Sequence, residues 1–316
     1  MRIGSICTGL WISVALALPS CCQANGEEEH NPAMFGLQVL GLVRPKDIII
    51  PQKEIFVIGA GYARTGTKST KKALSMLGYR AFHMEDIQSQ GLAPFFVKAL
   101  TSDAMMDAFI QKILDLGFNA TLDTPNNLLA VELYKRFPNA KVLFNIRDTP
   151  EGWAKSYHHL HSQFIQAFGP PFSFFLDFSF TLLAQIKVGN RPLEAKPCEP
   201  SIWTILMPWW TCLQVKNTEK EFVEDFYTFQ AYVEKNIPAD HIFYYNVKEG
   251  WGPLEKMTGV KAPNAPFPNI NESDSLKAIN TILITISIIW PFVVGFLLFV
   301  FIVIIRKVTD PFFAKH

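Results

Sequence analysis

The stretch from Ile55 to Gly78 constrains this chain most, because it predicts a strand, a loop and a helix in immediate succession. Ile55–Ile58 are apolar residues of the kind that form a buried strand, and a glycine-punctuated turn follows them. The helix is predicted from residues that recur at helical spacing: Thr70, Ala73, Leu74 and Leu77. Gly78 stands where a helix C-terminus favours a residue of positive φ.

The loop of this unit has the composition of an anion-binding site. Backbone N–H groups at a helix N-terminus lack helical partners, and the helix dipole favours negative charge there. Cationic and hydroxyl side chains gather at the same place: Arg64, Thr65, Thr67, Lys68 and Ser69. The ligand predicted by this pattern is a phosphate-like group.

Two familiar phosphate-binding patterns fit the loop badly. Arg64 stands where a dinucleotide-binding fingerprint needs its third glycine. Gly61 and Gly66 have the spacing of a Walker-type loop, but Thr67 intervenes before Lys68. Neither a dinucleotide site nor a standard nucleotide triphosphate site is therefore the preferred interpretation.

Strand and helix signals alternate through the rest of the domain. The predicted strands after the first are Tyr79–His83, Ala120–Leu122, Lys141–Ile146 and His241–Tyr245. Helices are predicted over Ala104–Leu116, after Thr124-Pro125, and behind a capping box of Thr218 with Glu221. This alternation predicts an α/β fold of three layers, with a mostly parallel central sheet between helices.

The N-terminal residues 1–24 have the three regions of a secretory signal peptide. Arg2 precedes an apolar run, and small residues end at Ala24, where we expect cleavage. An uncleaved signal anchor is the alternative. Residues 25–53 show no clear period and are predicted to be a linker or surface extension before a domain at 54–275.

The segment 279–305 is a 27-residue stretch without a charged side chain, long enough to span a bilayer as a C-terminal transmembrane helix. Arg306 and Lys307 follow it directly, whereas Glu272 and Asp274 precede it. The positive-inside tendency places the tail 306–316 in the cytosol. We therefore expect a single-pass membrane protein whose domain lies in the secretory lumen (Golgi or ER) or outside the cell.

Charge and cysteine content narrow the class further. A formal net charge of +1 gives no basic field for nucleic acid, so nucleic-acid binding is set aside. The mature chain would keep Cys198 and Cys212, which could form a disulfide or remain two buried thiols. His158, His159 and His161 lie in one predicted helix without supporting carboxylates or cysteines, so no metal site is expected.

The run Arg64-Thr-Gly-Thr-Lys-Ser69 resembles the 5′-phosphosulfate-binding loop of the sulfotransferase family. A second feature, Arg147 after the central strand and Ser156 on the next helix, is similar to another signature of that family. The spacing here is nine residues instead of about eight, and Lys155 is a candidate substitute for Ser156. Further motifs in the same order extend the resemblance across Ile55–Leu276.

The resemblance implies a P-loop-like fold and transfer of a sulfuryl group from 3′-phosphoadenosine 5′-phosphosulfate (PAPS), with no metal. The 5′-phosphate would be held by Thr65, Gly66, Thr67, Lys68 and Ser69, and the 3′-phosphate by Arg147 and Ser156. Arg64 would stabilise the bridging oxygen and the developing charge. Asp123 is the first choice for the general base, with His83 and Glu85 as reserves.

The acceptor is expected to be a hydroxyl or amine on a small molecule, a glycan or a lipid-linked compound. Aromatic residues across Phe164–Leu183 allow a hydrophobic acceptor. The leading alternative is a catalytically inactive membrane-tethered binding protein of the same fold, which the Arg147 to Ser156 spacing favours. A nucleotide-phosphate kinase is a third interpretation, disfavoured by the offset Walker-type pattern.

Overall fold

The computed structural model describes residues 51–100, 102–167, 187–188, 191–192, 195–196, 214–215, 217–270 and 272–313. Several predictions therefore fall outside the described residues. These are the signal peptide at 1–24, the linker up to residue 50, Cys198 with Cys212, and the aromatic segment beyond Ala167.

The domain is built on a five-stranded sheet with the order β2-β3-β1-β4-β9. Every pairing within it is parallel. Its strands are β1 (Val57–Gly59), β2 (Ala81–Phe82), β3 (Ala120–Thr121), β4 (Lys141–Asn145) and β9 (Ile242–Tyr245). The predicted mostly parallel α/β sheet is confirmed. Two short antiparallel pairs lie apart from it: β5 (Lys187–Val188) with β6 (Arg191–Pro192), and β7 (Ala195–Lys196) with β8 (Gln214–Val215).

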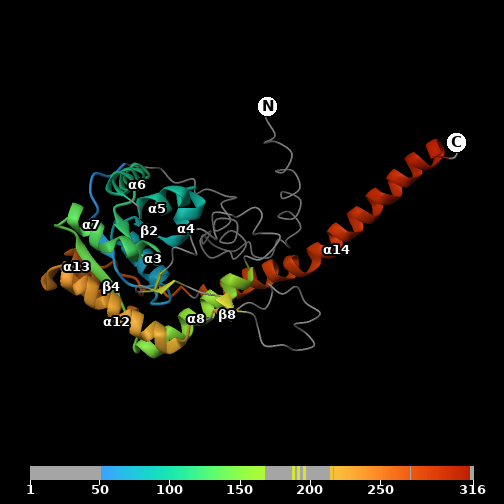
Figure 1. Cartoon of the computed structure of the whole chain (residues 1–316). Coiled ribbons are helices and arrows are strands. Elements are labelled where there is room, and N and C mark those ends of the chain that lie inside the picture. Colours follow the sequence, from blue (N-terminus) through green and yellow to red (C-terminus); the bar gives the residue numbers. More distant parts are fainter. Residues whose placement is uncertain are drawn as a thin grey trace.

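Helices cover both faces of this sheet (Figure 1). One face packs against α5 (Ala93–Ala99), α6 (Asp103–Asp115), α7 (Ala130–Arg136), α8 (Pro150–Ala167) and α12 (Glu219–Asn236). The other packs against α3 (Thr67–Met76) and α13 (Trp251–Thr258). The alternation of strand side chains explains this arrangement, because Val142 and Phe144 enter the first core and Leu143 enters the second.

The helix α12 shows how closely local pattern and structure agree. Thr218 and Glu221 form the predicted capping box at its start. The predicted apolar stripe is buried in the core: Phe222, Phe226, Phe229 and Val233.

Three local features differ from the sequence-based expectations. Two helices follow β2 that were not predicted, α4 (Met84–Ser89) and α5. The second strand was expected over Tyr79–His83, but β2 covers only Ala81–Phe82. It lies at the edge of the sheet and pairs only with β3. The helix expected after Thr124-Pro125 begins as a 3₁₀ turn, η2 (Asn126–Leu129), behind a cis peptide bond, and α7 starts at Ala130.

The last element that the structure describes is the long helix α14 (Glu272–Phe313), which leaves the domain beside α8 and extends away from it (Figure 1). Its segment Asn280–Arg306 is long and apolar enough to cross a membrane. Large apolar side chains on it are exposed, and Phe292 reaches 74% exposure. Exposed apolar residues in such number are typical of a surface that lipid or protein covers.

Candidate active site

The loop between β1 and α3 is shaped by residues in the left-handed region of backbone conformation. Arg64 has a φ of 69° and Gly66 a φ of 84°. A side chain at position 66 would also be obstructed, because a Cβ there would lie 2.5 Å from Cγ1 of Val247. Gly66 is the N-cap residue of α3, so the first N–H groups of that helix point out of it without helical partners. The loop thus presents a helix N-terminus suited to an anion.

Hydrogen bonds from neighbouring elements hold this loop in place. The Ala63 N–H donates to Oγ1 of Thr124 over 3.0 Å, and the Ala63 carbonyl accepts from Nε1 of Trp153 over 2.9 Å. The Thr65 hydroxyl donates to the Tyr62 carbonyl over 2.6 Å. The loop is therefore anchored to the segment after β3 and to α8, and its conformation is set before any ligand binds.

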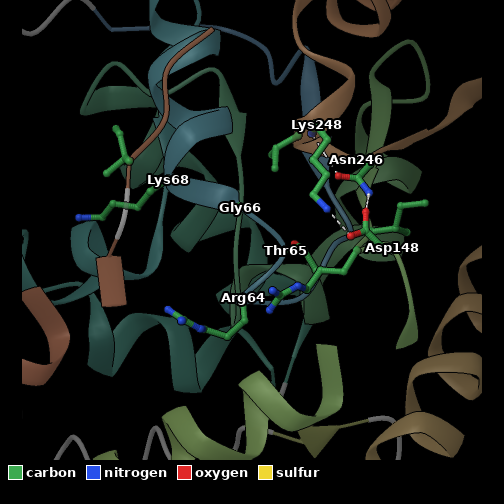
Figure 2. A pocket seen from close by; sticks show the side chains of 11 residues that line it. Arg64, Thr65, Gly66, Lys68, Asp148, Asn246 and Lys248 are labelled. Carbon is green, nitrogen blue, oxygen red and sulfur yellow. Dashed lines mark hydrogen bonds and ion pairs between the residues drawn. The ribbon is translucent and has the colours of Figure 1, made fainter. Parts of the chain in front are cut away.

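A pocket of about 220 Å³ lies between this loop and the carboxyl ends of β4 and β9. Its lining consists of Arg64, Thr65, Gly66, Lys68, Ile146, Arg147, Asp148, Asn246, Val247, Lys248 and Ile270. Figure 2 shows Asp148, Asn246 and Lys248 together on one side of Gly66. There Asn246 Nδ2 donates to Asp148 Oδ1 over 2.8 Å, and Lys248 pairs with Asp148 Oδ2. Cationic side chains outnumber acidic ones around this pocket, which favours an anionic ligand.

Arg64 and Lys68 lie on the other side of Gly66 (Figure 2). Nε of Arg64 donates to Oγ of Ser156 on α8 over 3.1 Å. Nζ of Lys68 lies 2.6 Å from Oε2 of Glu85 on α4. Both cations of the loop are thus oriented by side chains from other elements.

A buried polar cluster lies on the β2–β3 side of the loop. The Thr67 hydroxyl donates to Oδ1 of Asp123 over 3.0 Å, and His83 Nε2 lies 3.2 Å from the same hydroxyl oxygen. His83 Nε2 is also 3.4 Å from Asp123 Oδ2. Exposure is 2% for Thr67, 3% for His83 and 5% for Asp123. Asp123 has a φ of 74°, a strained value for a residue with a side chain.

Burial lowers the pKa of His83 to about 3, with the charge of Glu85 opposing this shift and the charges of Lys71 and Lys68 adding to it. The imidazole is therefore neutral near pH 7. Because the Thr67 hydroxyl donates its hydrogen to Asp123, its oxygen accepts from Nε2–H of His83. Nδ1 of His83 is buried and has no hydrogen-bond partner among the described residues.

Comparison with known proteins identifies the domain that carries these features. The family model of the sulfotransferase domain matches residues 56–276, a range that contains the loop and every residue of the pocket lining. The chain belongs to the sulfotransferase domain family. It is also similar to the Ava biosynthesis cluster protein M of Aspergillus versicolor, with 25% identity over 233 residues, 69% of this chain and 81% of the relative. The family resemblance inferred from the motifs is confirmed, and the domain is that of a transferase.

The sulfotransferase domain brings part of the predicted donor-binding set to the pocket. The lining includes Thr65, Gly66, Lys68 and Arg147, and Ser156 contacts Arg64 from α8. The Thr67 side chain instead turns to Asp123. Oγ of Ser69 accepts from the Ile270 N–H over 3.0 Å and holds the C-terminal segment against α3. Thr67 and Ser69 are therefore outside the pocket lining, and their hydroxyls are used within the protein.

The predicted catalytic residues divide between the two sides of the loop. Arg64 lines the pocket, whereas Asp123 and His83 meet Thr67 in the buried cluster. Sequence reasoning did not single out Asn246, Val247 and Lys248 as site residues. The signal that would have found them is their position directly after β9, since strand ends in a parallel sheet form the ligand-binding edge.

Proposed function

We propose that this protein is a PAPS-dependent sulfotransferase, anchored by α14 in a membrane of the secretory pathway with its domain on the lumenal or extracellular side. The observation that carries this proposal is the pocket in which Arg64, Lys68 and Arg147 surround the N-terminus of α3. The domain of the sulfotransferase family supplies the reaction class.

The donor fits the β1–β4–β9 side of the loop. The 5′-phosphosulfate would be held by the N–H groups at the start of α3 together with Thr65 and Lys68, and the 3′-phosphate by Arg147. At about 220 Å³ the pocket is below the roughly 300–1,000 Å³ of a site for a complete drug-sized ligand. It suits the phosphate-bearing part of a larger nucleotide. Ser156 does not line this pocket, and its hydroxyl oxygen accepts from Nε of Arg64.

The acceptor would approach from the β2–β3 side. In the transfer, the acceptor oxygen or nitrogen bonds to sulfur, the sulfur bond to the phosphate oxygen breaks, and the acceptor proton passes to a base. Asp123 is our choice for that base. Its Oδ1 accepts a hydrogen bond from the Thr67 hydroxyl, and Nε2 of the neutral His83 lies 3.4 Å from its Oδ2. Arg64 would stabilise the negative charge that develops on the leaving phosphate oxygen.

The acceptor class follows from the membrane attachment only in part. Helix α14 would keep the domain close to a bilayer, which favours an acceptor that is presented at a membrane, such as a lipid-linked hydroxyl. A soluble small molecule and a glycan are the other acceptor classes for this chemistry.

The test is calorimetric binding of 3′-phosphoadenosine 5′-phosphate to the full chain in detergent micelles. Arg147→Ala and Arg64→Ala should weaken binding at least tenfold, because each removes a charge from the pocket. Lys98→Ala, which removes an exposed charge on α5 outside the pocket lining, is the matched control and should bind as the wild type does.

Transfer of labelled sulfate from PAPS to a phenol, a glycan and a lipid-linked hydroxyl then separates the acceptor classes. A well-folded wild-type chain that binds no nucleotide would overturn the proposal. Nucleotide binding without transfer to any of these acceptors would favour a tethered binding protein of the same fold.

A further inference from the structure

We propose that Glu85 is a positioning residue: it keeps the ammonium group of Lys68 away from the phosphate loop until an anionic ligand replaces Glu85 as the partner of Lys68. The inference rests on the proposed function, because it concerns the loop that would bind the donor phosphate. In this inference Glu85 competes with the bound anion for the ammonium group of Lys68.

The position of Lys68 makes this competition possible. Lys68 is the second residue of α3, in the turn whose N–H groups face the loop, and it contributes to the pocket lining. Its ammonium group lies 2.6 Å from Oε2 of Glu85 on α4. Figure 2 shows the side chain directed away from the Asp148 and Lys248 side of the pocket. The backbone of Lys68 is thus at the anion site while its charge is engaged elsewhere.

A second ion pair leaves Glu85 with a cationic partner after Lys68 has moved. Lys71, three residues further along α3, places Nζ 2.7 Å from Oε1 of Glu85 and 2.8 Å from Oδ2 of Asp86. When Lys68 leaves for a phosphate, Glu85 keeps Lys71 as its partner. No carboxylate is left unpaired in this partly buried region, which would otherwise be a costly result.

Glu85 remains charged throughout this exchange. Burial by itself raises the pKa of Glu85, but the ammonium groups of Lys71 and Lys68 more than offset this effect and hold the pKa below its usual range. A phosphate carries more negative charge than the Glu85 carboxylate, so it can still attract Lys68. The long flexible side chain of Lys68 allows its ammonium group to change partners.

The consequence is that removing the charge of Glu85 should tighten anion binding through Lys68. The experiment measures the Kd of 3′-phosphoadenosine 5′-phosphate and of inorganic pyrophosphate for the full chain in micelles. Four forms form a cycle: wild type, Glu85→Gln, Lys68→Met and the double variant. We expect Glu85→Gln to lower both Kd values roughly three- to tenfold, and to have no such effect when Lys68 is absent.

Asp86→Asn is the matched control, because it removes a neighbouring carboxylate that pairs with Lys71 and not with Lys68. Asp86→Asn should not tighten binding. If it did, the effect of Glu85→Gln would come from a general loss of negative charge and not from the release of Lys68. A mere structural ion pair would give a different outcome, in which Glu85→Gln weakens binding or acts equally with and without Lys68. Either result would overturn the inference.

The two probes also separate this inference from the proposed function. A wild-type chain that binds pyrophosphate but no nucleotide would contradict the donor assignment and leave the exchange at Lys68 intact. Nucleotide binding that Glu85→Gln leaves unchanged would contradict the exchange alone. A chain that binds neither probe would overturn both.

Discussion

The two sides of the phosphate loop differ in their access to solvent and in the chemistry that this access permits. On the β4–β9 side, Arg147, Asp148 and Lys248 are exposed around an open pocket. On the β2–β3 side, His83 and Asp123 are almost completely buried. Charges in a low dielectric interact more strongly than charges in water. The proposed function divides two tasks between these sides, with anion capture on the exposed side and proton transfer on the buried side.

The first and largest test of this division concerns Asp123. Asp123→Asn keeps an oxygen that can accept from the Thr67 hydroxyl, but it removes the capacity to take a proton. We expect the turnover number for sulfuryl transfer to fall by about 10²–10⁴-fold. The Kd of the donor nucleotide should change less than about threefold, because Asp123 does not line the donor pocket. Steady-state kinetics and calorimetry on the same preparations measure both.

Asp86→Asn is the control for Asp123, since Asp86 is another buried carboxylate of the same region. It should leave turnover much closer to that of the wild type. Parallel loss of donor binding and turnover in Asp123→Asn would show that the two sides of the loop are not separate.

The second prediction concerns the backbone of the exposed side. Gly66→Ala should destabilise the fold by about 2–4 kcal/mol, because it combines a left-handed φ with overpacking against Val247. Gly78→Ala is a close control, since Gly78 has a φ of 89° but nothing within 4 Å of an added Cβ. It should cost only about 1–2 kcal/mol. Urea unfolding of the two variants measures the difference.

A rescue variant locates the cause of that difference. Val247→Ala combined with Gly66→Ala removes the methyl groups that the new Cβ would meet. The double variant should recover stability relative to Gly66→Ala. Equal losses for Gly66→Ala and Gly78→Ala would mean that the close approach of Val247 to the loop does not matter.

The same comparison shows what the sequence could and could not predict. Local pattern predicts the strand, the loop and α3, because each depends on residues close in sequence. It also predicts Arg147 at the end of β4, since the strand-end rule is topological. These predictions describe the exposed side of the site well.

The buried side depends on side-chain directions that no local pattern contains. Thr67 belongs to the phosphate-binding motif, yet its hydroxyl faces Asp123 because the loop turns through left-handed conformations at Arg64 and Gly66. The pairing of Lys68 with Glu85 joins α3 to α4, a helix that was not predicted. The acidic residues Glu85 and Asp86 in the first turn of α4 were the available signal for that helix.

The third prediction uses the buried imidazole. The pKa of His83 is about 3 in the folded chain and about 6.5 when unfolded. Between these values the unfolded chain binds a proton that the folded chain does not. Stability contributed by His83 is therefore present above about pH 6.5 and declines as the pH falls. At pH 5 the loss from this group should be about 2 kcal/mol.

Unfolding of the wild type and of His83→Gln at pH 7.5 and pH 5 tests this effect. His83→Gln should remove about 2 kcal/mol of the acid-induced loss. His161→Gln provides a comparison outside the site, because burial also lowers the pKa of His161, to about 4. The two effects should add in the double variant. An unchanged acid response in His83→Gln would mean that the imidazole does not remain neutral in the folded protein.

The smallest effects are expected for the exposed ion pair of Asp148 and Lys248, which lines the pocket on its β4–β9 side. The side chain of Lys248 is 72% exposed and that of Asp148 is 57% exposed, so neither Asp148→Asn nor Lys248→Met should measurably change the unfolding free energy. Their effects on donor binding should have opposite signs. Asp148→Asn should tighten nucleotide binding roughly twofold and Lys248→Met should weaken it by a similar factor, because each changes the charge at the pocket.

Both changes in affinity should shrink at about 0.5 M salt, where charges in contact with solvent are screened within a few ångströms. The Glu85→Gln effect should persist there, because its side chain is only 14% exposed. Calorimetric titrations at low and high salt therefore compare the two sides in one experiment. If Asp148→Asn and Glu85→Gln responded equally to salt, the contrast between a solvent-screened side and a protected side of the loop would be wrong.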